Sequence, residues 1–245
     1  MACSGHAGAV KTIGFIGGMS WESTAVYFRV ANEMVRRQLG GLHSARTLTV
    51  TVDFAEIEQM QVAGRWSDAG DLLAELAAGL EAAGADLIVL CTNTMHKVSA
   101  QIEAAIAVPF IHLAEVTADA VLAADITRVG LLGTAFTMEQ DFYIDRLAAR
   151  GLDVILPDAQ DRAEVHRIIY DELCVGIVSD ESRETYLGVI DRFDRAGADG
   201  VILGCTEIEL LIGQVDTDLP VFPTTRIHTA AAVSMALGQS VSWAE

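Results

Sequence analysis

Two segments of this chain repeat one another, and this repeat constrains the fold more than any other feature. Residues 84–94 read GADLIVLCTNT and residues 197–207 read GADGVILGCTE, an offset of 113. A second pair, IGFIGG at 13–18 and VGLLGT at 129–134, is offset by 116. Self-similarity at a fixed spacing indicates a duplicated structural unit. The 245 residues are therefore expected to form two similar halves of about 113 residues each.

The order of apolar runs indicates the class of each half. Short β-type runs alternate with helical stretches such as Leu72–Ala83, which Gly84 should cap, and this alternation is typical of parallel βαβ units. We expect an α/β protein with two pseudo-symmetric Rossmann-like domains and a cleft between them. Residues 1–115 with 228–245 would form the N-terminal domain, and 116–227 the C-terminal domain. The predicted strands are residues 12–16, 47–53, 87–91, 110–113, 128–132, 153–156, 201–204 and 221–222.

Composition and charge exclude several classes of partner. With 16 Lys and Arg against 34 Asp and Glu, the net charge is −18, which argues against nucleic-acid binding. The longest apolar stretch, residues 104–124, is interrupted by Pro109 and by charged residues, so no membrane span is expected. Residues 1–10 do not resemble a secretory signal, and we predict a cytoplasmic protein. The four cysteines are too scattered for a disulfide framework or a zinc site.

The motifs of common cofactors are absent. Lys11 and Lys97 are the only lysines, which disfavours a pyridoxal enzyme with its Schiff-base lysine. Neither a GxSxG nor a P-loop string occurs. The sequence GFIGG at 14–18 lacks the GxGxxG spacing of dinucleotide sites, so it indicates a tight turn, or a loop binding a small anionic group, before a helix capped by Ser20. No cofactor and no metal are expected.

The repeat also predicts where a ligand binds. In parallel α/β sheets, the loops after the carboxyl ends of the strands form the binding crevice. The 113-residue offset aligns Thr92 with Cys205 and Thr94 with Glu207. If equivalent loops meet across one cleft, a hydroxyl and a thiol approach the ligand from opposite sides.

The chemistry of these two residues depends on their neighbours. Cys205 is either a buried structural cysteine or a reactive thiol; backbone N–H groups at the turn would raise its thiolate fraction, whereas Glu207 would oppose ionisation. His96 either orients the Thr92 hydroxyl or serves as a capping or packed imidazole. The remaining cysteines and two further histidines are expected to be structural: Cys3, Cys91, Cys174, His112 and His228.

Four motifs together resemble a known family. They are IGFIGGMSWEST at 13–24, CTNTMHK at 91–97, LLGTAFTMEQDFY at 131–143 and GCTEIELL at 204–211. They are similar to the aspartate/glutamate racemase family, and in particular to its bacterial branch of L-specific aspartate/glutamate or broad-specificity amino-acid racemases. The resemblance runs from Lys11 to Leu237.

The resemblance implies a cofactor-independent racemase with one base on each face of the substrate Cα. Its two bases carry over to Thr92 and Cys205, with aspartate or glutamate as the expected substrate. In many members a cysteine occupies the position of Thr92 and a cation that of Gln61; the Thr/Cys pair implies unequal proton transfer in the two directions. The implied substrate-binding residues are Met19, Gln61, Asn93, Thr94, Thr134 and Thr206.

Two other functions fit the residues. A related enzyme could use Cys205 alone, for hydantoin racemisation or for decarboxylation of a malonate-like acid. A non-catalytic protein could instead bind a small dicarboxylate between its two halves. The apolar composition and the family also imply a homodimer.

Overall fold

The computed structural model describes residues 10–241 and 243, and its strands form two separate parallel sheets. The first sheet has the order β2-β1-β3 and the second β5-β4-β6-β7. The predicted α/β class with two parallel sheets is therefore confirmed. The strands are β1 (Ile13–Gly17), β2 (Thr47–Thr51), β3 (Leu87–Leu90), β4 (Arg128–Gly133), β5 (Asp153–Ile155), β6 (Gly200–Gly204) and β7 (Val221–Pro223).

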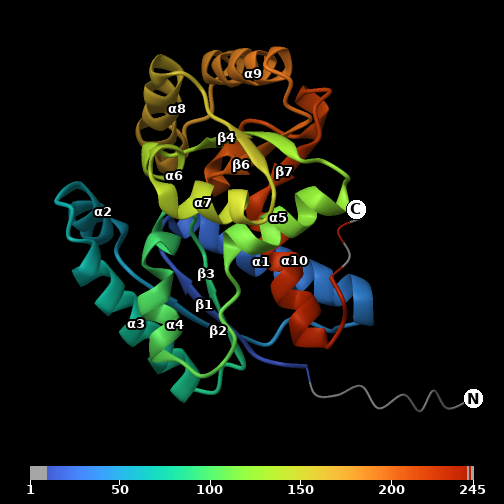
Figure 1. Cartoon of the computed structure of the whole chain (residues 1–245). Coiled ribbons are helices and arrows are strands. Elements are labelled where there is room, and N and C mark those ends of the chain that lie inside the picture. Colours follow the sequence, from blue (N-terminus) through green and yellow to red (C-terminus); the bar gives the residue numbers. More distant parts are fainter. Residues whose placement is uncertain (1–9, 242, 244–245) are drawn as a thin grey trace, which may run out of the picture.

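Helices lie on both faces of each sheet, and the two sheets lie one above the other in Figure 1. The α-helices are α1 (Trp21–Leu39), α2 (Phe54–Val62), α3 (Trp66–Ala82), α4 (Ser99–Ala105), α5 (Leu113–Ala123), α6 (Ala135–Glu139), α7 (Asp141–Ala149), α8 (Ala159–Asp171), α9 (Asp180–Arg195) and α10 (Thr224–Leu237). Four short 3-10 helices complete the order: η1 (Thr94–Val98), η2 (Leu173–Val175), η3 (Thr206–Leu210) and η4 (Gln214–Asp216).

The sequence repeat is visible in the topology. In each sheet the first strand of the half is central, with the second strand on one side and the third on the other. Beside β3, Phe110 forms a single bridge with Ile88, in the place where Val221 of β7 pairs with Val201 of β6. The predicted strand at 110–113 is wrong beyond this bridge, because Leu113 already begins α5. Every other predicted strand forms.

The packing of the first sheet follows the alternation of its strands. In β1, Ile13 and Phe15 join one hydrophobic cluster and Ile16 joins the cluster on the opposite face, as expected for successive side chains of a strand. Ala232 of α10 belongs to the same cluster as Phe15, and α10 lies beside α1 (Figure 1). The chain thus returns to the first sheet at its end. The exact domain boundaries remain a prediction, and the boundary at 115/116 falls within α5.

The glycines after β1 form a tight turn into α1. Gly18 has a φ of 94°, and a Cβ there would lie 2.3 Å from the Val52 carbonyl oxygen. Its N–H donates to the Thr24 hydroxyl at 2.8 Å, so this donor is not free for an anionic ligand. The Ser20 side chain accepts from the Ser23 N–H and caps α1, as the sequence predicts.

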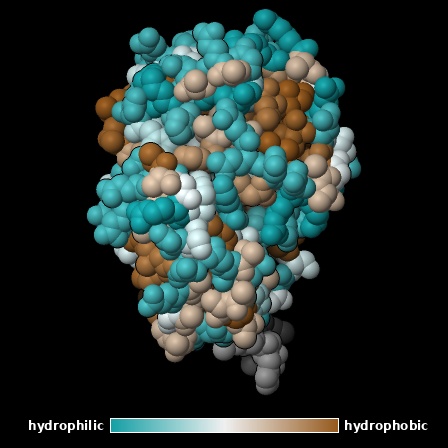
Figure 2. All heavy atoms as spheres, turned by 60° about the vertical axis from the view of Figure 1, so that its left-hand side comes forward, coloured by the Kyte–Doolittle hydropathy of each residue, from teal (hydrophilic) through white to brown (hydrophobic). Residues whose placement is uncertain are grey.

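The outer surface is largely polar on the face shown in Figure 2, where hydrophobic residues gather in separate groups. Within residues 10–241 and 243, no helix has the length and apolar character needed to cross a membrane.

Candidate active site

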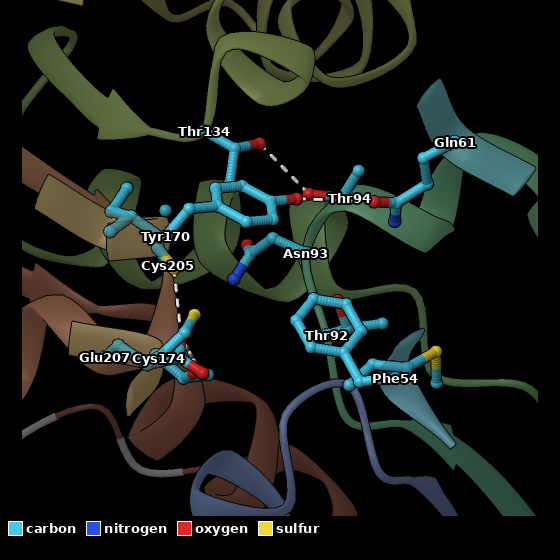
Figure 3. Close-up of a pocket in the computed structure, with 14 residues that line it drawn as sticks. Phe54, Gln61, Thr92, Asn93, Thr94, Thr134, Tyr170, Cys174, Cys205 and Glu207 are labelled. Carbon is cyan, nitrogen blue, oxygen red and sulfur yellow. Dashed lines mark hydrogen bonds between the residues drawn. The ribbon is translucent and has the colours of Figure 1, made fainter. Parts of the chain in front are cut away.

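A narrow cavity lies between the two halves (Figure 3). Its open volume is about 20 Å³, which is room for about one water molecule. All eight residues assigned from the sequence line it, so the structure brings the whole predicted set together. The lining residues are Met19, Phe54, Gln61, Thr92, Asn93, Thr94, Thr134, Ile169, Tyr170, Cys174, Gly204, Cys205, Thr206 and Glu207.

The ends of β3 and β6 place the two central loops. Thr92 follows β3 and Cys205 follows β6 directly, and each loop continues into a 3-10 helix, η1 or η3. In Figure 3, Cys205 and Thr92 lie on opposite sides of the cavity with Asn93 between them. This is the arrangement expected for repeat-related loops at the carboxyl ends of parallel strands.

The Cys205 thiol is held by a carboxylate. Its Sγ donates to Glu207 Oε2 at 3.0 Å, and the Thr206 hydroxyl donates to the same oxygen at 2.6 Å. Glu207 is the one charged side chain among the described residues lining the cavity. Burial, followed by the negative charge of Glu207, raises the pKa of Cys205 well above its ordinary value. Of the two influences weighed from the sequence, the opposition of Glu207 to ionisation prevails, and in this state the thiol keeps its proton.

The Thr92 loop is fixed through its backbone. His96 Nε2 accepts from the Leu113 N–H at 3.2 Å, so Nδ1 carries the proton and donates to the Thr92 carbonyl at 2.7 Å. Burial lowers the pKa of His96 well below its ordinary value, which keeps the ring neutral. The capping interpretation of His96 is confirmed. The other interpretation is wrong, because no described residue hydrogen-bonds the Thr92 hydroxyl.

Asn93 has one free polar atom. Its Nδ2 donates to the Thr224 hydroxyl at 3.1 Å, and this hydroxyl donates in turn to the Leu203 carbonyl at 2.8 Å. These two bonds fix the orientation of the amide. The buried Oδ1 atom has no hydrogen-bond partner within the described chain, so it offers an acceptor to a ligand donor.

Side chains also meet across the cleft. Thr94 and Thr134 join through their hydroxyls at 3.0 Å. Tyr170 of α8 donates to Gln61 Oε1 of α2 at 3.3 Å, and its ring stacks on Phe54 with centroids 6.3 Å apart. Figure 3 shows this hydroxyl and amide group above Asn93.

The sequence did not identify the contribution of α8 and η2 to the cavity. Tyr170 and Ile169 were not assigned to the site, and Cys174, expected to be structural, lines the cavity. One signal could have identified Tyr170. It lies on the helix after the second strand of its half, as Gln61 does in the first half.

The other structural assignments hold for the residues that the structure describes. Cys91 is buried in a hydrophobic cluster. His228 donates from Nε2 to the Ile111 carbonyl and accepts from the Tyr27 hydroxyl, each at 2.8 Å. His112 packs edge-to-face on His96. No group of metal-ligating side chains occurs in residues 10–241 and 243, and Cys3 lies outside them.

Comparison with known proteins identifies the family. The sequence profile of the Asp/Glu/hydantoin racemase family matches residues 16–232. The chain belongs to this family. A candidate Asp/Glu racemase from Yersinia pestis has a solved structure with 52% identity and a TM-score of 0.87, covering 93% of this chain and 99% of that one. An aspartate racemase homologue from Pyrococcus horikoshii OT3 has 33% identity and a TM-score of 0.82, covering 92% and 99%.

A further relative matches only part of this chain. An uncharacterised protein from the pnlA 3′ region of Pectobacterium carotovorum subsp. carotovorum is 32% identical over 133 residues, which is 54% of this chain and 83% of that protein. This chain therefore shares its two-sheet α/β fold with these structural neighbours.

Proposed function

We propose that this protein is a cofactor-independent amino-acid racemase that interconverts the enantiomers of aspartate or glutamate. Thr92 and Cys205 are the two bases. The observation that carries the proposal is that a hydroxyl and a thiol from repeat-related loops line one cavity from opposite sides. A substrate Cα between them would have one proton carrier on each face.

Inversion then needs two proton transfers. One group takes the α-proton, which leaves a planar carbanion stabilised as an enolate, and the group on the other face supplies a proton. General acid–base catalysis by such a pair contributes about 10²- to 10⁴-fold per group. Further stabilisation comes from fixed donors around the developing enolate. Thr94 and Thr134 supply hydroxyls for this purpose, whereas the Thr206 hydroxyl donates to Glu207.

The polar groups suggest how an amino acid is oriented. The free Oδ1 of Asn93 suits the α-ammonium group as an acceptor. No cation lines the cavity among the described residues, so both carboxylates of an acidic substrate must be bound by neutral donors. The Tyr170 hydroxyl and the Gln61 amide are our candidates for the side-chain carboxylate.

Closure of the two halves is part of the proposal. A cavity of about 20 Å³ holds about one water molecule and no amino acid. The halves must therefore separate to admit substrate and enclose it again. Enclosure excludes water, which strengthens every electrostatic contact with the enolate.

Isotope exchange tests the reaction directly. The purified protein is incubated in D₂O with each enantiomer of aspartate and glutamate, without pyridoxal phosphate. Deuterium should enter Cα as optical rotation decays, and Cys205→Ala should abolish both. Absence of exchange for every common amino acid would refute the proposal. Turnover of a hydantoin or a malonate-like acid instead would establish the alternative that uses Cys205 alone.

A cytoplasmic location and a homodimer stay predictions. Two exposed aromatic side chains, Trp21 and Phe28, lie seven residues apart on α1 and thus on one face of the helix. Such a face is a suitable site for contact with a second copy.

A further inference from the structure

The two halves contact each other through the capping residues of two helices. Ser20 caps α1 and Thr134 caps α6. Ser20 bonds Glu207 of the other half, and Thr134 bonds Thr94 of the other half. Glu207 and Thr94 are equivalent in the repeat, each two residues after a proposed base. Each of the two loops thus bonds a helix cap of the other half, and only the Cys205 loop places a carboxylate in that contact.

Glu207 receives three hydrogen bonds. The Ser20 hydroxyl donates to Oε1 at 2.5 Å, the Thr206 hydroxyl donates to Oε2 at 2.6 Å, and the Cys205 thiol donates to Oε2 at 3.0 Å. The side chain is only 4% exposed. No arginine or lysine of the described chain lines the cavity beside it. A buried carboxylate in contact with a thiol, and fixed by two hydroxyls, is positioned to exchange a proton with that thiol.

We infer that Glu207 is the proton partner of Cys205, and that Ser20 holds it in place from across the cleft. The inference rests on the proposed racemase function for its role in turnover. When Cys205 acts as base, its S–H bond breaks, an O–H bond forms on Glu207 Oε2, and the negative charge moves from the carboxylate to sulfur. The thiolate then takes the α-proton. The pair carries one negative charge before and after the internal transfer.

The Ser20 contact connects this proton exchange to closure. Ser20 belongs to the loop after β1, whereas Cys205, Thr206 and Glu207 all belong to the loop after β6. Separation of the halves would break the Ser20 bond and leave the other two intact. The full set of donors to Glu207 therefore exists only when the two halves are closed on each other.

Other ionisable groups also face the thiol–carboxylate pair. Cys174 and the tyrosine hydroxyls of α1, α8 and α9 interact electrostatically with Glu207. These groups are unchanged in the variants below, so differences between variants report on Glu207 itself. The groups are Cys174, Tyr27, Tyr170 and Tyr186.

Thiol labelling provides the first test. The rate of Cys205 alkylation by iodoacetamide is followed against pH, with the labelled peptide read by mass spectrometry. Glu207→Gln removes the negative charge beside the sulfur, so the midpoint of labelling should fall by about one pH unit or more. The kcat for racemisation should nevertheless fall about 10²-fold or more. KM should change less than about threefold, because Glu207 acts through Cys205. Glu207→Asp should recover part of kcat.

Ser20→Ala tests the contact across the cleft, with Ser179→Ala as its matched control. Ser179 caps α9 in the same way, accepting from the Ser182 N–H, and it lies outside the cavity. Both variants lose a helix cap, which costs about 1 kcal/mol. Only Ser20→Ala should lower kcat, by about tenfold. Equal kcat values in the two variants would overturn the role of Ser20.

The remaining outcomes separate this inference from the proposed function. An unchanged labelling midpoint, or an unchanged kcat, in Glu207→Gln would overturn the role of Glu207. Labelling needs no substrate, so it tests the thiol–carboxylate pair even if the wild-type protein racemises nothing. In that case the proposed function fails, while a shifted midpoint would still support the pairing.

Discussion

His112 is a buried histidine whose replacement should stabilise the protein, most strongly in acid. It precedes α5 and packs edge-to-face on His96, with ring centroids 4.7 Å apart. Neither ring nitrogen of His112 has a hydrogen-bond partner within the described residues. Burial, and then the positive charge of Arg146, lower its pKa to about 3. His112→Phe keeps a planar aromatic ring at this site and removes both unpaired nitrogens, so at neutral pH it should stabilise the fold by about 1 kcal/mol or more.

The larger effect depends on pH. In the unfolded chain His112 binds a proton below its ordinary pKa of about 6.5, whereas in the native state it stays neutral down to about pH 3. The unfolded state therefore binds more protons in this window, and the free energy of unfolding decreases as the pH falls through it. At about pH 5, which is about 1.5 units below the pKa of His112 in the unfolded chain, this loss of unfolding free energy is about 2 kcal/mol.

Urea unfolding at about pH 7.5 and pH 5 measures the effect. The wild-type protein should lose about 2 kcal/mol more than His112→Phe between the two pH values. Burial also lowers the pKa of His228, to about 4, so the variant should keep part of the acid sensitivity. Replacing the exposed His43 by Gln controls for the loss of a histidine. Equal acid losses in the wild type and His112→Phe would refute the reasoning.

Two further predictions concern the cleft and the turn before α1. Thr92→Cys should keep racemase activity and bring the kcat values of the two directions closer together, because both faces then carry a thiol. Stopped assays with each enantiomer test this. Complete loss of activity would argue against Thr92 and Cys205 as opposed bases. Gly18→Ala should lower the free energy of unfolding by about 2 kcal/mol or more, because its Cβ would meet the Val52 backbone at a φ of 94°. Gly84→Ala, at a φ of 100° with no atom near its Cβ, should cost clearly less in the same urea titration.

The repeat explains why so much of the fold could be predicted. Gly84 and Gly197 both have positive φ before equivalent strands, and Asp86 and Asp199 donate their N–H groups to equivalent carbonyls of the neighbouring strand segment. These local rules lie in the sequence and occur twice. The failure at residues 110–113 is equally local, because after one bridge the backbone turns into α5.

The candidate site was predicted where it lies on repeated loops or, as for Gln61, where a residue matches the family, and it was missed elsewhere. Cys205 was identified because its loop matches that of Thr92. Tyr170 and Cys174 lie in a segment without a matching motif, and only the contact between α2 and α8 brings Tyr170 to the cavity. The direction of the Cys205 pKa could not be predicted, because it depends on burial and on the Glu207 rotamer.

The duplicated architecture and the asymmetric chemistry are compatible for a thermodynamic reason. Two enantiomers have the same free energy, so the equilibrium constant of racemisation is one, and kcat/KM must be equal in the two directions. A thiol with a carboxylate partner on one face and a bare hydroxyl on the other cannot change that equality. The difference between Cys205 and Thr92 can therefore be expressed only in kcat and KM separately. Measuring kcat/KM for both enantiomers is thus a check on the assay, while the ratio of kcat values reports the asymmetry of the site.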